Sequence, residues 1–193
     1  GRTARQLAIM PCFLFTAATA FTSPSTWSPG VAVGPRVSGQ AAAVDANGRV
    51  LAYGGLTNGA GSPTTNELWA YDKSVWTKIE SSGGPGQRMY AASAVLGDKF
   101  FLFGGWDPEA PGTGGSFLDE SWRLDLKTLE WAQLTALPGG PVSRHTACSV
   151  GDKIVIQTFR GTVLCDGEAV VEQPTTGEAP LGFSMSAAAP LGV

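Results

Sequence analysis

The sequence contains an internal repeat, and a period of about fifty residues restricts the fold more than any other feature of the chain. In each of three copies an arginine precedes a run of small and apolar residues, a turn at Gly or Asp follows, and a second apolar run comes next. The arginines are Arg36, Arg88 and Arg144, which lie 52 and then 56 residues apart. A repeated unit of this size indicates an array of similar supersecondary structures, each of which buries its apolar surface against its neighbours.

The first two copies share further elements in the same order. The second apolar run ends in a glycine pair, a loop rich in Gly, Pro and Ser follows, and a Trp-containing segment leads through a turn to another Trp. These elements are Gly54, Gly55, Tyr71, Asp72 and Trp76 in the first copy and Gly104, Gly105, Asp125 and Trp131 in the second. Short apolar runs separated by turn residues predict β-strands. The glycine pairs predict positive φ angles and a close approach of neighbouring backbone.

This order of elements resembles the kelch repeat, and the resemblance covers residues 35–193. It implies an all-β chain folded as a kelch-type β-propeller, in which four-stranded antiparallel blades pack face to face around an axis. We expect about three blades, at residues 35–82, 83–138 and 139–178, and the first strand of a fourth within residues 179–193. Because a closed propeller has about four to eight blades, we expect an incomplete ring that is a fragment of a longer propeller.

The third copy departs from the pattern at two points. Gln157 and Thr158 stand where the glycine pair is expected, and Val170 and Val171 occupy the strand that carries a Trp in the other copies. In the first two copies we expect the large aromatic side chains to be buried between blades, since each offers about 150–250 Å² for burial. These residues are Trp69, Trp76, Trp122, Trp131, Phe100, Phe101 and Phe103.

The chain begins with a segment that has the composition of a targeting sequence, because its first acidic residue is Asp45. The apolar run from Leu7 to Ala20 follows two arginines and is too short to span a bilayer, so residues 1–20 are predicted to be a secretory signal peptide. Residues 21–34 are rich in hydroxyl groups and resemble the transit-like part of a secondary-plastid presequence, with a linker as the alternative. We expect entry into the secretory pathway and delivery to a secondary plastid. One alternative is a secreted protein. Another is that the apolar run is a buried strand or helix of the domain and no signal peptide.

The composition argues against several kinds of function. Thirteen basic and sixteen acidic residues argue against a nucleic-acid partner. The single histidine, His145, is the one candidate base for a Ser-His-Asp triad, but it lies at the start of a repeat strand, where we expect a structural role. One His and three Tyr are too few for a copper site like that of galactose-oxidase-type propellers, and no phosphate-binding glycine loop occurs. We therefore expect no catalytic residue, metal or cofactor in this part of the protein.

The cysteines predict no disulfide. Cys12 belongs to the predicted signal peptide, whereas Cys148 and Cys165 belong to the first and third strands of the third blade. Two strand spacings amount to about 9–10 Å, which is too far for a disulfide bond. We predict two free, buried thiols.

The remaining candidate site is a binding surface built from two parts. Kelch propellers mostly bind other proteins, and in some of them arginines around the axis hold acidic segments, so the resemblance implies such a role for Arg36, Arg88 and Arg144. Their guanidinium groups suit carboxylates. The alternative is that each arginine pairs with an acid of a neighbouring blade and holds the ring together.

The second part is formed by the long loops at about residues 56–66 and 106–119. Loops at blade ends are exposed and free to carry recognition. Trp106 is the candidate anchor, since Trp is enriched in binding hot spots, and Asp107 lies beside it.

The predicted function is therefore a kelch-repeat protein-interaction module that binds a partner protein, with an acidic segment as a candidate ligand. We expect the other partners to be the remaining blades of its own full-length chain, without nucleic acid or a membrane span. The alternative function is part of a propeller enzyme, galactose-oxidase-like or other, whose catalytic residues lie outside this sequence. A third possibility is a degenerate relic without a partner.

Overall fold

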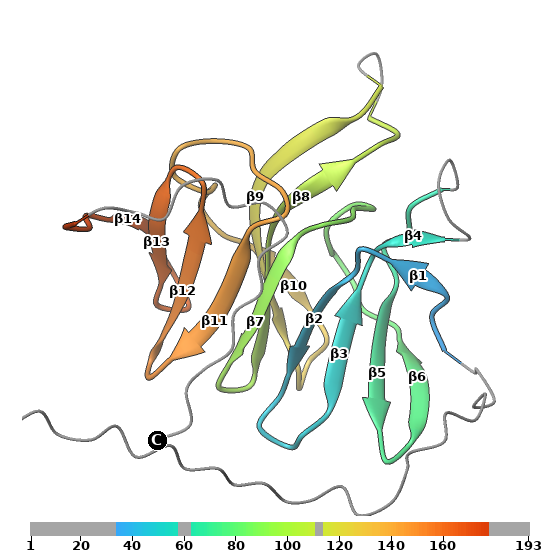
Figure 1. Ribbon diagram of the computed structural model, residues 1–193. Coiled ribbons are helices and arrows are strands. Elements are labelled where there is room, and N and C mark those ends of the chain that lie inside the picture. Colours follow the sequence, from blue (N-terminus) through green and yellow to red (C-terminus); the bar gives the residue numbers. More distant parts are fainter. Residues whose placement is uncertain (1–33, 58–62, 111–113, 178–193) are drawn as a thin grey trace, which may run out of the picture. The chain divides into compact units, whose positions relative to one another are not determined.

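Each repeat copy forms one four-stranded antiparallel sheet in the computed structural model, which describes residues 34–57, 63–110 and 114–177 (Figure 1). The first sheet has the order β2 (Ala41–Val44), β3 (Val50–Tyr53), β5 (Leu68–Asp72), β6 (Val75–Ile79). The second has the order β7 (Ala92–Leu96), β8 (Lys99–Asp107), β9 (Ser116–Asp125), β10 (Trp131–Gln133). The third has the order β11 (Thr146–Val150), β12 (Lys153–Thr158), β13 (Gly161–Cys165), β14 (Val170–Gln173). The prediction of three four-stranded blades is confirmed.

The first strand of each blade is also its innermost strand. In Figure 1, β7 lies between β2 and β11, and it contacts both of them. These three strands are made of small side chains, such as Ala41, Ala92, Ala94 and Ala147, which allow neighbouring backbones to approach closely. The remaining strands of each blade follow outward in sequence order because each is joined to the last by an antiparallel turn.

The hydrophobic core consists of two clusters, one at each contact between neighbouring blades. Between the first and second blades, Leu51, Tyr53 and Leu68 pack with Phe100 and Trp131. Between the second and third blades, the buried cluster includes Phe101, Phe103, Ile154, Ile156 and Val163. Alternation along β8 directs Phe100 toward one blade and Phe101 toward the other. The second blade is thus covered by an apolar layer on both faces, which a single four-stranded sheet cannot achieve alone.

The predicted burial of aromatic side chains is confirmed for some residues and wrong for others. Phe100, Phe101 and Phe103 have no exposed surface, and Trp131 is 8% exposed. Trp69 and Trp76 are half-buried on the face of the first sheet that points away from the second blade. The reason is strand alternation, since Leu68 and Ala70 occupy the inward positions of β5.

Two elements were absent from the sequence prediction. A two-stranded sheet forms from β1 (Val37–Ser38) and β4 (Leu56–Thr57), before and after the first hairpin of the first blade. In addition, β8 does not end at the glycine pair, as the pattern predicted, but runs through it to Asp107, with a register irregularity between Phe103 and Gly105. As a result β8 and β9 project beyond the other strands as a long hairpin (Figure 1).

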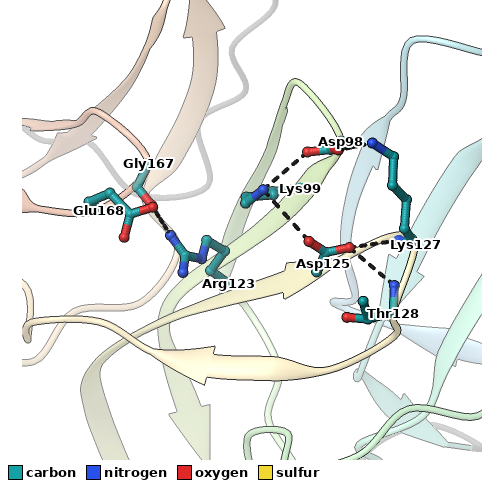
Figure 2. A network of polar contacts seen from close by, with 8 residues as sticks. All are labelled: Asp98, Lys99, Arg123, Asp125, Lys127, Thr128, Gly167 and Glu168. Atoms are coloured by element: carbon teal, nitrogen blue, oxygen red, sulfur yellow. Dashed lines mark hydrogen bonds and ion pairs between the residues drawn. The ribbon is translucent and has the colours of Figure 1, made fainter.

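Polar contacts hold the second blade to the third and shape its outer turn (Figure 2). Arg123 on β9 donates to the carbonyl oxygen of Gly167, 2.8 Å away, and forms an ion pair with Glu168. Asp125 accepts hydrogen bonds from the backbone N–H groups of Lys127 and Thr128, at 2.8 and 3.1 Å, so it stabilises the β9–β10 turn.

A group of alternating charges joins this turn to the β7–β8 turn of the same blade (Figure 2). Lys127 Nζ lies 2.6 Å from an Asp98 oxygen, and Lys99 Nζ lies 3.1 Å from Asp98 and 3.7 Å from Asp125. The hydrogen bonds from Lys127 and Lys99 lower the pKa of Asp98 to about 2. The corresponding turn after Asp72 is built differently, with positive φ at Lys73 (46°) and Ser74 (70°).

The predicted absence of a disulfide between Cys148 and Cys165 is confirmed, since both thiols are free. Register places Cys148 beside Val155 on one face of the third sheet, whereas Cys165 lies on the opposite face within the core. Cys165 is buried as predicted, but Cys148 is half-exposed, so the prediction of two buried thiols is wrong for Cys148. The face of the sheet, rather than the strand, decides which thiol is covered.

We expect the two thiols to react with maleimide at very different rates in the folded chain. Burial raises the pKa of the Cys165 thiol and also shields it, so both the thiolate fraction and access are low. Cys148 should be modified at least about tenfold faster than Cys165, measured by peptide mass spectrometry after timed labelling. Labelling in urea is the control and should remove the difference. Equal rates in the folded protein would contradict the burial of Cys165.

The predicted signal peptide, the transit-like segment and the predicted fourth-blade strand at residues 184–189 lie outside the described residues. Within the described part of the chain no helix is long and apolar enough to cross a membrane.

Candidate functional site

A backbone hydrogen-bond chain joins the three blades just before their innermost strands. Tyr90 N–H donates to the carbonyl oxygen of Gly39 (2.7 Å), and Arg144 N–H donates to the carbonyl oxygen of Tyr90 (2.9 Å). Each of the three residues lies two positions before its strand, and all three have positive φ, at 70°, 57° and 57°. Positive φ is uncommon for residues with a Cβ, so Tyr90 and Arg144 are held by the surrounding structure.

The side chains at these positions stack on one another. The guanidinium carbon of Arg144 lies 4.3 Å from the centre of the Tyr90 ring, and the Tyr90 ring in turn occupies the space above Gly39, 2.7 Å from where a Cβ would stand. A guanidinium over an aromatic face is a cation–π contact, worth about 0.5–1 kcal/mol at exposed sites. We call Gly39, Tyr90 and Arg144 the axial stack. Nothing in the composition pointed to Tyr90, because its role depends on the position of the backbone before β7.

The three arginines singled out by the sequence are not at equivalent positions, which corrects the repeat alignment. Gly55 N–H donates to the carbonyl oxygen of Arg88 (2.8 Å), whereas the matching Gly105 N–H donates to that of Val142 (2.9 Å). Arg88 therefore corresponds to Val142, and Arg144 corresponds to Tyr90. The sequence alignment matched one arginine with another although the loops before them differ in length. The backbone hydrogen bonds give the true equivalence between the second and third blades.

Arg88 is enclosed within its own blade. Its side chain is 2% exposed, and it donates to the carbonyl oxygens of Gly86 (3.0 Å) and Gly104 (3.1 Å) and to the carboxylate of Glu120 (2.5 Å). Burial would raise the pKa of Glu120, but hydrogen bonds from Arg88 and Trp122 outweigh burial and lower it. Each of the three guanidinium nitrogens donates to the protein, so Arg88 binds the protein itself rather than facing a ligand. The acid belongs to the same blade, not to the neighbouring blade that the structural alternative named.

Arg36 and Arg144 differ from Arg88 in exposure and in pairing. Arg36 is exposed and lies directly before β1, and Arg144 is half-buried. Among the described arginines, Arg49, Arg88 and Arg123 form ion pairs with Asp45, Glu120 and Glu168. No ion pair to a described carboxylate involves Arg36 or Arg144. Of the three arginines singled out by the sequence, these two therefore keep a charge that is available to a ligand.

Trp106 and Asp107 lie in the projecting β8–β9 hairpin. The indole of Trp106 packs over Gly115, and its backbone pairs with Met89 through two hydrogen bonds of 2.8 and 2.9 Å. Trp106, the candidate anchor, is half-buried. Its cross-strand neighbour Phe117 is 53% exposed and is the more accessible aromatic residue, which the sequence pattern did not indicate.

Asp107 belongs to a polar group that connects the hairpin to the loop of the first blade. Gln87 Nε2 donates to Glu109 (2.7 Å) and, more weakly, to Asp107 (3.4 Å), and Glu109 accepts from the backbone N–H of Thr64 (3.2 Å). Asp107 also accepts from the backbone N–H of Glu109 (3.0 Å). These contacts fix the base of the hairpin. No described hydrogen bond joins Trp106 or Asp107 to the residues of the axial stack.

His145 directly follows Arg144 and is buried, with 7% exposure. Its burial lowers the pKa of the imidazole to about 4. In the described part of the chain no group of three His, Cys, Asp or Glu side chains is placed to hold a metal ion.

Comparison with known proteins assigns the chain to a family. Residues 12–173 match the KLHDC2/KLHL20/DRC7 Kelch-repeats domain, which is most of the sequence. The chain belongs to the kelch-repeat family. The kelch match begins within the segment predicted to be a signal peptide.

Three relatives show where similar kelch segments occur. Host cell factor of Drosophila melanogaster is 30% identical over 128 residues, which are 60% of this chain and 8% of that protein. Host cell factor homolog hcf-1 of Caenorhabditis elegans is 26% identical over 179 residues, 81% of this chain and 22% of that protein. A probable serine/threonine-protein kinase of Dictyostelium discoideum is 31% identical over 117 residues, 56% of this chain and 8% of that protein.

This kelch chain therefore spans between 8% and 22% of the length of these relatives. The family and the host cell factor relatives support a protein-interaction module.

Proposed function

We propose that this kelch segment binds an acidic segment of a partner protein at the axial stack. The observation that carries the proposal is the Arg144 guanidinium, which is held over Tyr90 at 4.3 Å and forms no ion pair with a described carboxylate. A guanidinium that is already oriented loses less conformational freedom when it binds a carboxylate. Arg36 supplies a second, exposed positive charge in the first blade.

The blade-end loops are proposed to contribute secondary contacts. Phe117 and Trp106 are cross-strand neighbours on the projecting hairpin, and Phe117 exposes about half of its surface. Aromatic side chains on a fixed hairpin provide contact area at a small entropic cost. Arg88 and Asp107 are proposed to support this surface from within, because their contacts are to the protein itself.

The test uses a fluorescein-labelled hexaglutamate peptide as the probe and fluorescence anisotropy at low salt. Replacing Arg144 with Gln should weaken binding about 10- to 100-fold, since a hydrogen bond to a charged group contributes about 1.5–3 kcal/mol. Binding by the unmodified chain should also weaken with added salt, because the contact is ionic and partly exposed.

The matched control is Arg160→Gln. Arg160 also stacks on an aromatic ring, with its guanidinium carbon 4.4 Å from the centre of Phe159, but it donates to the carbonyl oxygens of Gly140 and Pro141. The two variants lose the same charge, so non-specific attraction to the peptide should weaken equally in both. Because only Arg144 belongs to the axial stack, only Arg144→Gln should reduce binding substantially. Equal losses would show non-specific attraction and would overturn the proposal, as would hexaglutamate binding no better than hexaserine.

A further inference from the structure

His145 occupies the contact between the second and third blades. Its side chain extends from the residue before β11 to Gly104 on β8, where the imidazole Cε1 lies 3.1 Å from the position of a Cβ. The residue is 7% exposed, and neither ring nitrogen has a hydrogen-bond partner. A neutral imidazole tolerates such a site at a modest cost, whereas an imidazolium there would be a buried charge without a partner.

Two backbone hydrogen bonds join the second blade to the segment just before His145. Gly105 N–H donates to the carbonyl oxygen of Val142 (2.9 Å), and Arg144 N–H donates to the carbonyl oxygen of Tyr90 (2.9 Å). We call these two bonds the blade seam. The second bond is also part of the axial stack, so a change in the seam would move the Arg144 side chain relative to Tyr90.

Burial alone lowers the pKa of His145, and no charged neighbour contributes to the shift. On the second blade, the Arg88 guanidinium bonds the carbonyl oxygen of Gly104 (3.1 Å), and the Glu120 carboxylate is occupied by Arg88 and Trp122. Asp119 and Asp125 are the other acids on β9, and Tyr90 lies between Arg88 and β7. The segment from Leu134 to Val142 has no ionisable side chain, and the neighbour on the chain is the cation Arg144. Protonation would therefore create a buried positive charge without a hydrogen-bond partner.

We propose that neutral His145 is a positioning residue that keeps the blade seam closed and Arg144 over Tyr90, and that acidification opens the seam. A loss of ligand binding on acidification would rest on the proposed function of the axial stack. The opening of the seam does not depend on that function.

The size of the effect follows from proton linkage. The imidazole has a pKa of about 4 when buried, against 6.5 in water, so the open form binds protons more strongly than the closed form. Lowering the pH from 7 to 5 should raise the population of the open form about 20-fold. The stabilising contribution of neutral His145 is fully present above pH 6.5 and is lost progressively as the pH falls toward 4.

The experiment is amide hydrogen exchange of the intact chain at pH 7 and pH 5, corrected for intrinsic exchange rates. We expect the amides of Gly105 and Arg144 to lose about 20-fold of their protection at pH 5. The internal control is the Gly55 amide, which makes the equivalent bond to Arg88 (2.8 Å) at the first contact between blades, where no His is present. Protection at Gly55 should change little.

The variant His145→Phe should remove the pH dependence at Gly105 and Arg144, because a ring of similar size fills the site and cannot be protonated. If this variant does not fold, the imidazole signal of the unmodified chain can be followed by NMR, since His145 is the single histidine of the sequence. A pKa at or above 6.5, or equal loss of protection at Gly55, would overturn the proposal.

The two proposals fail in distinguishable ways. If protection at Gly105 and Arg144 depends on pH but hexaglutamate does not bind at pH 7, the proposed function is refuted and the role of His145 in the blade seam still stands. If hexaglutamate binds at pH 7 but the protection of Gly105 does not change with pH, only the proposed role of His145 is refuted.

Discussion

Replacing Arg88 with Ala is expected to lower the free energy of unfolding by about 3 kcal/mol, one of the two largest effects that we predict. The substitution removes three hydrogen bonds, to Gly86, Gly104 and Glu120, and leaves two carbonyl oxygens and a carboxylate without their donor. The Glu120 side chain keeps 34% exposure, so water can partly compensate for the lost guanidinium. This access places the expected loss at the lower end of the range for buried ion pairs.

Urea unfolding of the intact chain provides the measurement. Lys127→Ala serves as the control, because Lys127 is 76% exposed and its contact with Asp98 is an exposed ion pair, so stability should change little. The double variant Arg88→Met, Glu120→Gln should recover part of the loss, since it removes the unpaired charge together with its partner. If Arg88→Ala were no more damaging than Lys127→Ala, the guanidinium would not hold the blade together.

Replacing Gly104 with Ala should destabilise the protein by at least about 3 kcal/mol, through left-handed backbone strain and through a clash. Gly104 has a φ of 55°, and its Cβ would lie 2.5 Å from the carbonyl oxygen of Val142 and 3.0 Å from that of Leu118. Both contacts are to backbone, which cannot rotate away. The Val142 carbonyl also accepts the Gly105 hydrogen bond, so the clash would disrupt the blade seam itself.

Gly97→Ala is the matched control for this substitution. Gly97 has nearly the same φ, 61°, but nothing lies within 4 Å of its added Cβ. Only the backbone strain remains there, and the expected cost is about 1 kcal/mol in urea unfolding. The difference between the two variants measures the close approach of the blades. Equal costs at both positions would mean that the blades can separate without loss of stability.

Much of the fold could be predicted from local sequence patterns. Alternating small and apolar runs identify β2, β3, β7 and β8, and the glycine pairs mark positions with φ of 55–111°. The third blade was predicted to keep four strands although it lacks the glycine pair and the Trp, and β14 forms around Val170 and Val171. Strands and turns of this kind are decided by residues that are close together in the chain, within one hairpin, so they can be recognised from the sequence.

The candidate site was predicted less well, because its geometry depends on contacts between blades. Three arginines looked equivalent in the sequence, yet one is enclosed by Glu120, one stacks on Tyr90 and one is exposed. Tyr90 carried no signal of its own, since a single Tyr in a loop fits many roles. Trp69 and Trp76 were expected between blades, but alternation along β5 and β6 turns them to the other face.

The sequence by itself determined that this chain is a kelch-repeat array of four-stranded blades, because short apolar runs, turns and paired glycines are local properties that recur in order. Only the tertiary structure decided which arginine is free to meet a ligand. The distinction between Arg88 and Arg144 comes from backbone bonds between segments far apart in the chain, such as Arg144 to Tyr90 and Gly105 to Val142. These bonds determine the register of one blade on the next, and the register places each guanidinium against a carboxylate or over an aromatic ring.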